Sequence, residues 1–217
     1  MSSQDPRAAA ARQWWLDSLA VAADEICAAL RERPGSQIAE LAGATWDEER
    51  GQLQLPFWSA PYIVTWPELT VSDAEGQPAR ADIRLIILFY LHRADGTLLT
   101  GRWLSFREMP DGTFYHQAFN SYTGQPLARA VGNAVDRLQR AAFKLGGQRE
   151  PIGDVGFRFR ALPRVWLALA YWLGDEEVPP QARVLFDAAS GHYLDAAGLA
   201  GLGAQLTGRL LRLLREE

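Results

Sequence analysis

The amino-acid sequence predicts a single α+β domain, in which a mainly antiparallel sheet packs against N-terminal, central and C-terminal helices. Apolar residues recur at helical spacing near both ends of the chain and in its middle. Between these segments, short stretches alternate apolar and polar residues, as strands with one buried face do. The 217 residues suffice for one domain with its own core, and no linker or repeat divides them, so we expect one domain over 1–217.

The N-terminal segment, about residues 5–33, is expected to be an amphipathic helix. Its apolar stripe recurs at spacings of three and four residues and consists of Trp15, Leu19, Ala22, Ile26 and Leu30. Cys27 lies beside this stripe, which favours a buried, inert thiol over a reactive one. As the only cysteine, Cys27 excludes an internal disulfide and a metal site made of cysteines alone.

The region 44–187 is expected to hold the sheet and further helices. "GQLQLPFW" and "PYIVTWPEL" have the composition of strands. The apolar run 83–91 fits a buried strand or a helix, and we predict a helix because Asp82 suits its N-cap and His92 its last turn. Residues 124–147 are predicted to form one continuous helix, with an apolar stripe of Leu127, Val131, Ala134, Leu138, Ala142 and Leu145.

The last part of the chain predicts a hairpin followed by a closing helix. Phe157 and Phe159 alternate with Arg158 and Arg160, so one face of this strand is apolar and the other cationic. Residues 165–173 are apolar on both faces, which indicates a strand covered on both sides. "GDEEVPP" then supplies a turn, and a further alternating strand follows. The closing helix, about 195–215, carries Leu199, Leu202, Leu206 and Leu210.

Composition excludes several classes of protein. With 48% hydrophobic and 22% charged residues the chain is not of the disordered type, and its net charge of −4 provides no basic patch for nucleic acid or for a membrane surface. No apolar run is long enough to span a membrane, and the N-terminus lacks the pattern of a secretory signal. We therefore expect a cytoplasmic protein, whose oligomeric state the sequence leaves open.

Metal and phosphate motifs are not found. His92, His116 and His192 lie far apart and none has the paired spacing of metal ligands, so no metal site is predicted. The glycine-rich stretch 198–208 lacks the Gly-Lys-Ser/Thr ending of a phosphate loop. Its glycines are explained more simply by close packing of a helix against a strand or a tryptophan.

Residues 103–119 contain one candidate site. Arg107, Glu108, Tyr115 and His116 lie near predicted turns, where functional side chains concentrate. Histidine side chains commonly act as acid–base groups near neutral pH, which makes His116 a candidate for that role. The alternative, which we favour, is a surface pair of Arg107 with Glu108 and a histidine bonded to the backbone.

The strand residues form a second candidate site. Arg158 and Arg160, with Arg164 nearby, could receive a carboxylate or phosphate group. They could equally pair with the acidic run Asp175, Glu176 and Glu177 across the same sheet, and we favour this internal pairing over catalysis by the run. Some of the eight tryptophans, Trp172 among them, are expected to line a pocket or a partner surface.

Several stretches resemble the domain-of-unknown-function family numbered 3786. They are "LTGRWLSFREMPDGTFYHQAF", "GQPLARAVGN" and "FRFRALPRVWLALAYWLGDEEVPPQARVLFDAASGHYL", and with the closing helix the resemblance covers roughly residues 12–214. The family occurs in anaerobes, and some members carry an added iron–sulfur domain of the kind found in corrinoid proteins. The resemblance thus implies a role near corrinoid, iron–sulfur or one-carbon chemistry, and it implies no catalytic residues. A single cysteine cannot hold a thiolate-ligated cluster.

We favour a non-catalytic protein that binds a small, partly apolar molecule or acts as an accessory protein. A corrinoid or other tetrapyrrole is one candidate ligand, with His116 or His192 as its axial ligand. The alternatives are a scaffold or subunit that docks on a larger complex, and an enzyme that uses Glu108 with His116, or the acidic run, for acid–base chemistry. The candidate ligand-binding residues are Arg107, Glu108, Tyr115, His116, Arg158, Arg160, Trp172, Asp175, Glu176 and Glu177.

Overall fold

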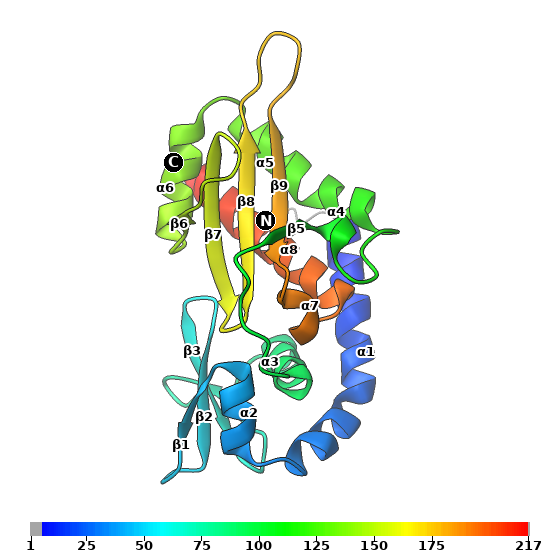
Figure 1. Cartoon of the computed structure of the whole chain (residues 1–217), viewed down its shortest axis with the longest axis vertical. Helices are drawn as coiled ribbons and strands as arrows, with labels where there is room; N and C mark the ends of the chain where they lie inside the picture. Colours follow the sequence, from blue (N-terminus) through cyan, green and yellow to red (C-terminus); the bar gives the residue numbers. More distant parts are fainter. Residues whose placement is uncertain (1–5, 217) are drawn as a thin grey trace.

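The computed structural model describes residues 6–216, which form a single α+β domain with two antiparallel sheets, as the sequence predicts (Figure 1). The helices are α1 (Pro6–Arg31), α2 (Gly35–Ala42), α3 (Ala81–Arg93), α4 (His116–Tyr122), α5 (Gly124–Val131), α6 (Val135–Lys144), α7 (Ser190–Tyr193) and α8 (Ala196–Glu216), with a 3₁₀ turn η1 (Phe106–Glu108). The strands are β1 (Thr45–Asp47), β2 (Gln52–Phe57), β3 (Ala60–Thr65), β4 (Val71–Asp73), β5 (Trp103–Ser105), β6 (Gln148–Arg149), β7 (Val155–Leu162), β8 (Val165–Trp172) and β9 (Gln181–Asp187).

The two sheets differ in how the chain builds them. The smaller sheet has the order β1-β2-β3-β4, so each strand pairs with the next one along the chain. The larger sheet has the order β5-β9-β8-β7-β6, in which β5 pairs with the much later β9. Leu104 of β5 therefore lies opposite Phe186 of β9, and the stretches around residues 100 and 187 meet at one edge of the larger sheet.

Helices cover one face of the larger sheet. In Figure 1, β7, β8 and β9 lie in front, with α5 and α8 behind them. Leu167, Leu169 and Tyr171 of β8 point to this covered face and are fully buried. The Tyr171 hydroxyl donates a 2.6 Å hydrogen bond to the Gly132 carbonyl at the end of α5, which ties the central strand to the helical layer.

The turn between β2 and β3 joins the two sheets. The backbone N–H of Trp58 donates a 2.7 Å hydrogen bond to the Ala161 carbonyl of β7. Buried side chains from both sheets and from α1, α2, α3 and α8 form one continuous hydrophobic cluster. The small sheet thus packs on the large one through the tip of a hairpin.

Several predicted elements are confirmed. Residues 81–93 form a helix, and β8 and β9 form the expected antiparallel hairpin. The predicted strands correspond to β2 and β3. Cys27 is buried, as are the predicted leucines of α8. Of the N-terminal stripe, Ile26 and Leu30 are buried, whereas the side chains of Trp15 and Leu19 lie outside the described residues.

The prediction of one continuous helix over 124–147 is wrong, because the chain forms α5 and α6 with a break between them. Gly132 adopts φ 56° and ψ −130°, a conformation that is open essentially to glycine alone and that ends α5. The break turns the second half of the predicted stripe, so that Ala134 is exposed while Leu138 remains buried. The apolar residues keep their helical spacing across the break, so the periodicity of the sequence does not indicate where α5 ends.

One further local prediction is wrong, and another is confirmed in part. Asp82 does not cap α3: Arg80 is the N-cap residue, and the Asp82 carboxylate in the first turn pairs with the Arg80 guanidinium at 3.1 Å. The glycines of 198–208 lie within α8, and Gly203 packs against the rings of Phe119 and of Phe186 in β9, so packing against a strand is confirmed at this glycine. Within residues 6–216, no helix is long and apolar enough to cross a membrane.

Candidate functional site

The second face of the larger sheet carries the cationic strand residues that the sequence singled out. Cross-strand partners share a face, and here Arg158, Ala168 and Leu185 form one row while Ala170 and Arg183 form the next. We call this surface the open face; it consists of Arg158, Arg160, Trp166, Ala168, Ala170, Trp172, Arg183 and Leu185. Of the described helices, none lies over it in Figure 1.

Long side chains, not a helix, bury the centre of the open face. Ala168 and Ala170 are almost fully buried, although only the other face of β8 has a helical layer. The guanidinium of Arg158 lies 5.3 Å from the ring of Trp166, and that of Arg183 lies 5.6 Å from the ring of Trp172. These stacked pairs flank the two alanines. The prediction that β8 is covered on both sides is therefore confirmed, with long side chains in place of a helix on this face.

The acidic run does not pair with the strand arginines. Asp175 accepts hydrogen bonds from the N–H groups of Glu177 and Val178, each at 2.8 Å, so it stabilises its own turn. These bonds lower the pKa of Asp175. The Arg158 guanidinium instead forms an ion pair with the Glu150 carboxylate, with 3.6 Å between nitrogen and oxygen. The predicted internal pairing is wrong because the run sits in the exposed loop that projects beyond β8 and β9 (Figure 1).

The residues of 103–119 are not gathered into a site. The Glu108 carboxylate accepts hydrogen bonds from the N–H and hydroxyl of Ser105 at 2.9 and 2.6 Å, and these bonds lower its pKa. It therefore caps η1 and makes no ion pair with Arg107. The His116 ring bonds the Thr113 carbonyl at 2.7 Å, as the favoured alternative predicts. Tyr115 is 66% exposed, and two strands separate this edge from Arg158.

The lone Asp187 at the end of β9 explains part of the sequence pattern around residues 100 and 187. Its carboxylate is 2% exposed and accepts hydrogen bonds from the Thr100 N–H and hydroxyl, the Gly101 N–H and the Ala189 N–H, at 2.7 to 3.1 Å. One buried carboxylate thus fixes the segment before β5 to the end of β9. Its role here is structural.

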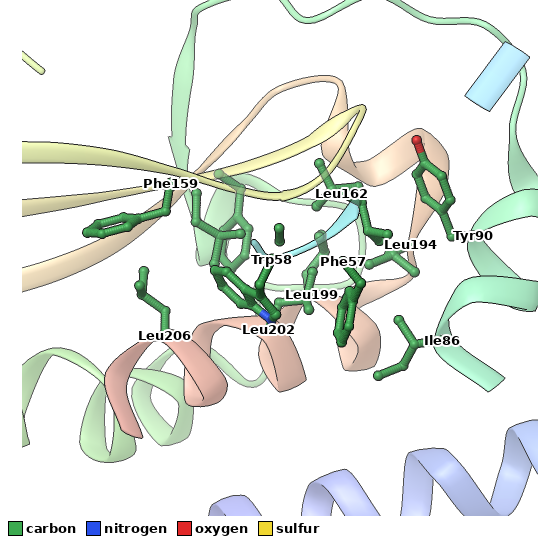
Figure 2. Packing of buried hydrophobic residues seen from close by; sticks show 14 of the residues in the cluster. Phe57, Trp58, Ile86, Tyr90, Phe159, Leu162, Leu194, Leu199, Leu202 and Leu206 are labelled. Carbon is green, nitrogen blue, oxygen red and sulfur yellow. The ribbon is translucent and has the colours of Figure 1, made fainter. Parts of the chain in front are cut away.

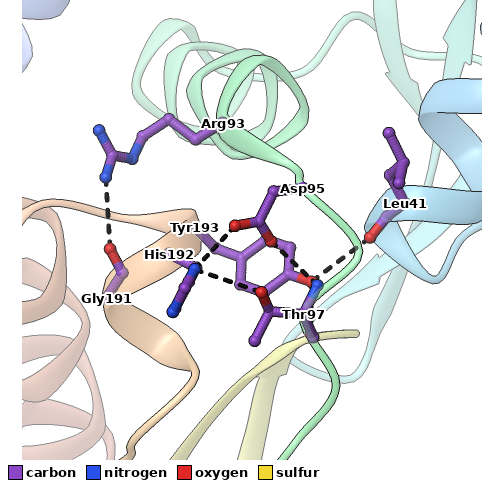
Figure 3. A network of polar contacts seen from close by, with 7 residues as sticks. All are labelled: Leu41, Arg93, Asp95, Thr97, Gly191, His192 and Tyr193. Atoms are coloured by element: carbon purple, nitrogen blue, oxygen red, sulfur yellow. Dashed lines mark hydrogen bonds and ion pairs between the residues drawn. The ribbon is translucent and has the colours of Figure 1, made fainter.

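A separate polar network joins α7 to the loop after α3 (Figure 3). The His192 Nδ1 lies 2.7 Å from a carboxylate oxygen of Asp95, and the Tyr193 hydroxyl donates a 2.6 Å hydrogen bond to the Thr97 carbonyl. Arg93 donates to the Gly191 carbonyl. Partial burial opposes ionisation of Asp95, but bonds from Thr97 and His192 outweigh it and lower its pKa. The network holds α7 on the loop after α3, and both of its ionisable partners are about half exposed.

A small cavity lies at the junction of the two sheets. Its volume is about 80 Å³, and it is lined by Trp58, Ser59, Lys144, Leu145, Phe159, Leu206 and Arg209. Figure 2 shows Trp58 among Phe159, Leu202 and Leu206, which belong to β7 and α8. The indole N–H of Trp58 donates a 2.9 Å hydrogen bond to the Gln205 side chain of α8. The cavity therefore combines apolar walls with two cationic side chains, Lys144 and Arg209.

The backbone of Trp58 takes an unusual conformation to reach this position. Trp58 and Ser59 form a two-residue turn between the paired residues Phe57 and Ala60, and Trp58 has φ 53°. Such turns usually have glycine at a positive φ, and for a bulky residue the strain is about 1–3 kcal/mol. The packing of the ring and its bond to Gln205 offset this strain. Strained backbone of this kind concentrates at functional sites.

Arg209 is the charged group of the cavity that is most withdrawn from water. Its guanidinium lies 4.9 Å from the centroid of the Trp58 ring. Burial and the neighbouring charge of Arg212 lower the pKa of Arg209, and only the Tyr62 side chain opposes them. Within the described part of the chain, Arg209 has no carboxylate partner. A partly buried cation without an anion is costly, so the cavity favours an anionic occupant.

Sequence analysis did not single out Trp58, Lys144 and Arg209. Trp58 is the last letter of a predicted strand, and Arg209 is embedded in the leucine stripe of the closing helix, where cations are ordinary. The fact that Lys144 is the only lysine of the chain was the one available signal. One tryptophan and one arginine line this cavity, and neither is among the residues that the sequence predicted for ligand binding.

The comparison with protein families settles the relationship suggested by the sequence. The model described as "Domain of unknown function (DUF3786)" matches residues 35–209, which is well over half of the chain. The protein belongs to the DUF3786 family. Comparisons with curated proteins and with solved structures found no match.

The DUF3786 match covers the part of the chain that forms the cavity. The match starts after α1, includes both sheets, and its last residue is Arg209 itself. All residues that line the cavity lie inside the DUF3786 region. Among the residues described, no group of three or more His, Cys, Asp and Glu side chains is placed to hold a metal ion.

Proposed function

We propose that the protein is a non-catalytic binding protein for a small organic anion, which it holds in the cavity between the β2–β3 turn and α8. The observation that carries the proposal is Arg209, a partly buried guanidinium stacked on Trp58 without a carboxylate partner in the described structure. A bound carboxylate would supply the missing charge and accept hydrogen bonds from the guanidinium.

The other lining residues support an amphipathic ligand. Lys144 brings a second cation and Ser59 a hydroxyl donor, whereas Phe159, Leu145 and Leu206 form apolar walls. Ligand sites commonly combine such walls with a few polar groups that fix orientation. A carboxylate attached to a short branched chain or to one aromatic ring has the matching chemistry.

The size of the cavity limits the ligand. Pockets for drug-sized ligands have volumes of roughly 300–1,000 Å³, whereas this cavity has about 80 Å³. A tetrapyrrole is therefore too large for it, and a place near corrinoid or one-carbon chemistry would concern a small metabolite and not the corrinoid ring. His116 and His192, the two candidate axial ligands, are not among the residues that line it.

The lining favours binding over catalysis. No histidine or carboxylate is among the residues that line the cavity, so Ser59 has no base there to activate it. The alternative of an enzyme would need a buried acid–base group, but Glu176 and Glu177 are exposed. The alternative of a docking subunit draws on exposed aromatic residues, of which Phe114 is 91% exposed beside Tyr115. A single projecting pair does not define an interface.

Isothermal titration calorimetry with benzoate, 3-methylbutanoate and inorganic phosphate tests the proposal. Benzamide serves as the neutral analogue of benzoate. We expect a carboxylate to bind with a dissociation constant below about 1 mM, which corresponds to about −4 kcal/mol, and the neutral analogue to bind at least about tenfold more weakly. Arg209→Met should remove binding of the anion, because it keeps an unbranched apolar stem but removes the charge and the hydrogen-bond donors.

The matched control is Arg212→Met, which removes an exposed arginine three residues further along α8. We expect this variant to bind as the unaltered protein does. Equal affinity of the Arg209→Met protein for the carboxylate, or equal affinity of the unaltered protein for benzoate and benzamide, would contradict the proposal. Preference for phosphate would correct the ligand class while leaving the site in place.

A further inference from the structure

The open face of the larger sheet carries charge that has no counterpart within the described chain. Arg160 is exposed and makes no ion pair among residues 6–216, and Arg183 is exposed beside Trp172. Antiparallel sheets do leave one face in water, but that face is then usually polar throughout. Here it includes two tryptophans and a partly buried leucine as well.

The acidic tip, which we define as Asp175, Glu176 and Glu177, is equally without a cation. Asp175 is used by its own turn, while Glu176 and Glu177 are exposed and make no ion pair in the described structure. The root of the loop is held in place. Gly174 exchanges two hydrogen bonds with the Asn133 side chain, at 2.9 and 3.0 Å. The acids are therefore presented on a fixed projection beyond the sheet.

The two charges lie at opposite ends of the same strand. Arg160 is paired with Trp166, near the start of β8, whereas the acidic tip follows Trp172 at its end. Arg183 lies beside Trp172, near the acidic tip, whereas Arg160 lies at the far end of β8, so a second copy turned end for end brings its acidic tip to Arg160. A two-fold axis creates that arrangement, with the same patch used by both subunits.

We propose that two copies of this chain associate through their open faces, with the acidic tip of each copy on Arg160 of the other. Charge complementarity selects a second copy as the occupant, because the anions that the arginine end lacks are present on the same chain. This inference is independent of the anion cavity, which lies on the covered side of the sheet with α8.

The shape of the open face suits such a contact. Ala168 and Ala170 at its centre are already covered within the chain, so a second copy would contact the partly buried rings of Trp166 and Trp172 beside them. Eight residues of β8 span about 26 Å, and three strands span about 14 Å. Each face thus covers about 360 Å², and two faces bury about 730 Å² before the tips are added, which is the size of a weak, transient interface. We therefore expect a modest affinity that depends on salt.

Charge reversal with sedimentation velocity tests the proposal. The protein is measured at about 1–200 μM in low salt and again in about 1 M sodium chloride, where the screening length falls to roughly 3 Å. We expect a concentration-dependent dimer in low salt and its dissociation in high salt. The tip variant, Glu176→Arg with Glu177→Arg, should raise the dissociation constant at least about tenfold, and so should Arg160→Glu.

Mixing the two variants provides the decisive measurement. Two copies of the same variant bring like charges together at both contacts and therefore repel each other. In the mixed dimer, the basic tip of the tip variant faces the glutamate that replaces Arg160. The acidic tip of the Arg160→Glu variant faces Arg160 of the tip variant. We therefore expect the mixture to recover the dimer that neither variant forms alone. Glu75→Arg, an exposed charge reversal on the smaller sheet, is the control and should leave the dimer unchanged.

The altered side chains are exposed, and circular dichroism verifies that each variant folds. An unaltered protein that stays monomeric at every concentration in low salt would overturn the proposal. So would a dimer that is insensitive to both charge reversals, or a mixture that stays monomeric.

Discussion

Asp187 allows the structural reasoning to be tested at one buried residue. Its carboxylate accepts hydrogen bonds from three N–H groups and one hydroxyl, and no cation lies among its partners. Asp187→Ala would leave four donors without their acceptor, of which the Ala189 N–H belongs to a buried residue and the other three to exposed residues. Each such bond to a charged group contributes about 1.5–3 kcal/mol, and part of the sum is offset by the desolvation of the carboxylate. We expect a net loss of about 3–5 kcal/mol in the free energy of unfolding.

Asp187→Asn sharpens this test because it conserves size and shape. One carboxylate oxygen faces the N–H groups of Thr100 and Ala189, and the other faces the N–H groups of Thr100 and Gly101. Whichever way the amide is turned, its NH₂ group faces an N–H donor. The asparagine variant should therefore lose about 2–4 kcal/mol, nearly as much as the alanine variant.

Urea denaturation followed by circular dichroism measures both losses. Asp73→Asn is the control, because Asp73 also accepts two N–H hydrogen bonds but is the partly exposed last residue of β4. It should lose no more than about 1 kcal/mol. If Asp187→Asn unfolds within about 0.5 kcal/mol of the unaltered protein, the effect is that of an ordinary surface substitution, and the structural role assigned to Asp187 is refuted.

Three further predictions concern the fold and its pH dependence. Tyr171→Phe should cost about 1–2 kcal/mol of unfolding free energy, because it removes the bond to the Gly132 carbonyl; an equal cost for exposed Tyr115→Phe would contradict this. Gly132→Ala should cost about 1–3 kcal/mol, whereas Gly208→Ala, with open space around it in α8, should stabilise by about 0.5–1 kcal/mol; denaturation of the two variants should give opposite signs. The lowered pKa of Asp95 contributes stability that is present above about pH 4 and is lost as pH falls further. Since Asp95 is about half exposed, we expect Asp95→Asn to remove less than about 1 kcal/mol at pH 7 and nothing at pH 2, and a variant whose loss is the same at both values would contradict the assignment.

Local patterns were enough to predict most of the elements. The alternation around Phe157, the turn at Gly174 and the leucines of α8 each depend on neighbours within a few residues, and periodicity reports such neighbours directly. The helix over 81–93 was also accessible in this way. The break at Gly132 was not, because it depends on one backbone conformation and leaves the apolar spacing nearly intact.

The candidate site depended on contacts that no local pattern contains. Trp58 and Arg209 are separated by most of the chain, and their stacking follows from the packing of a hairpin tip on α8. The acidic residues of the β8–β9 loop were conspicuous in the sequence for their composition, but their position relative to Arg158 depends on how far the hairpin projects. Whether charged residues of neighbouring strands pair across a sheet cannot be predicted unless the length of the hairpin that carries them is known.

The indole N–H resonance of Trp58 gives the most direct test of the proposed anion cavity. It is assigned by its absence from the spectrum of Trp58→Phe, and benzoate is then titrated into ¹⁵N-labelled protein. The account predicts that this resonance shifts and saturates in the unaltered protein and in Arg212→Met, but not in Arg209→Met. No shift up to millimolar benzoate, or the same saturation in Arg209→Met, would contradict it.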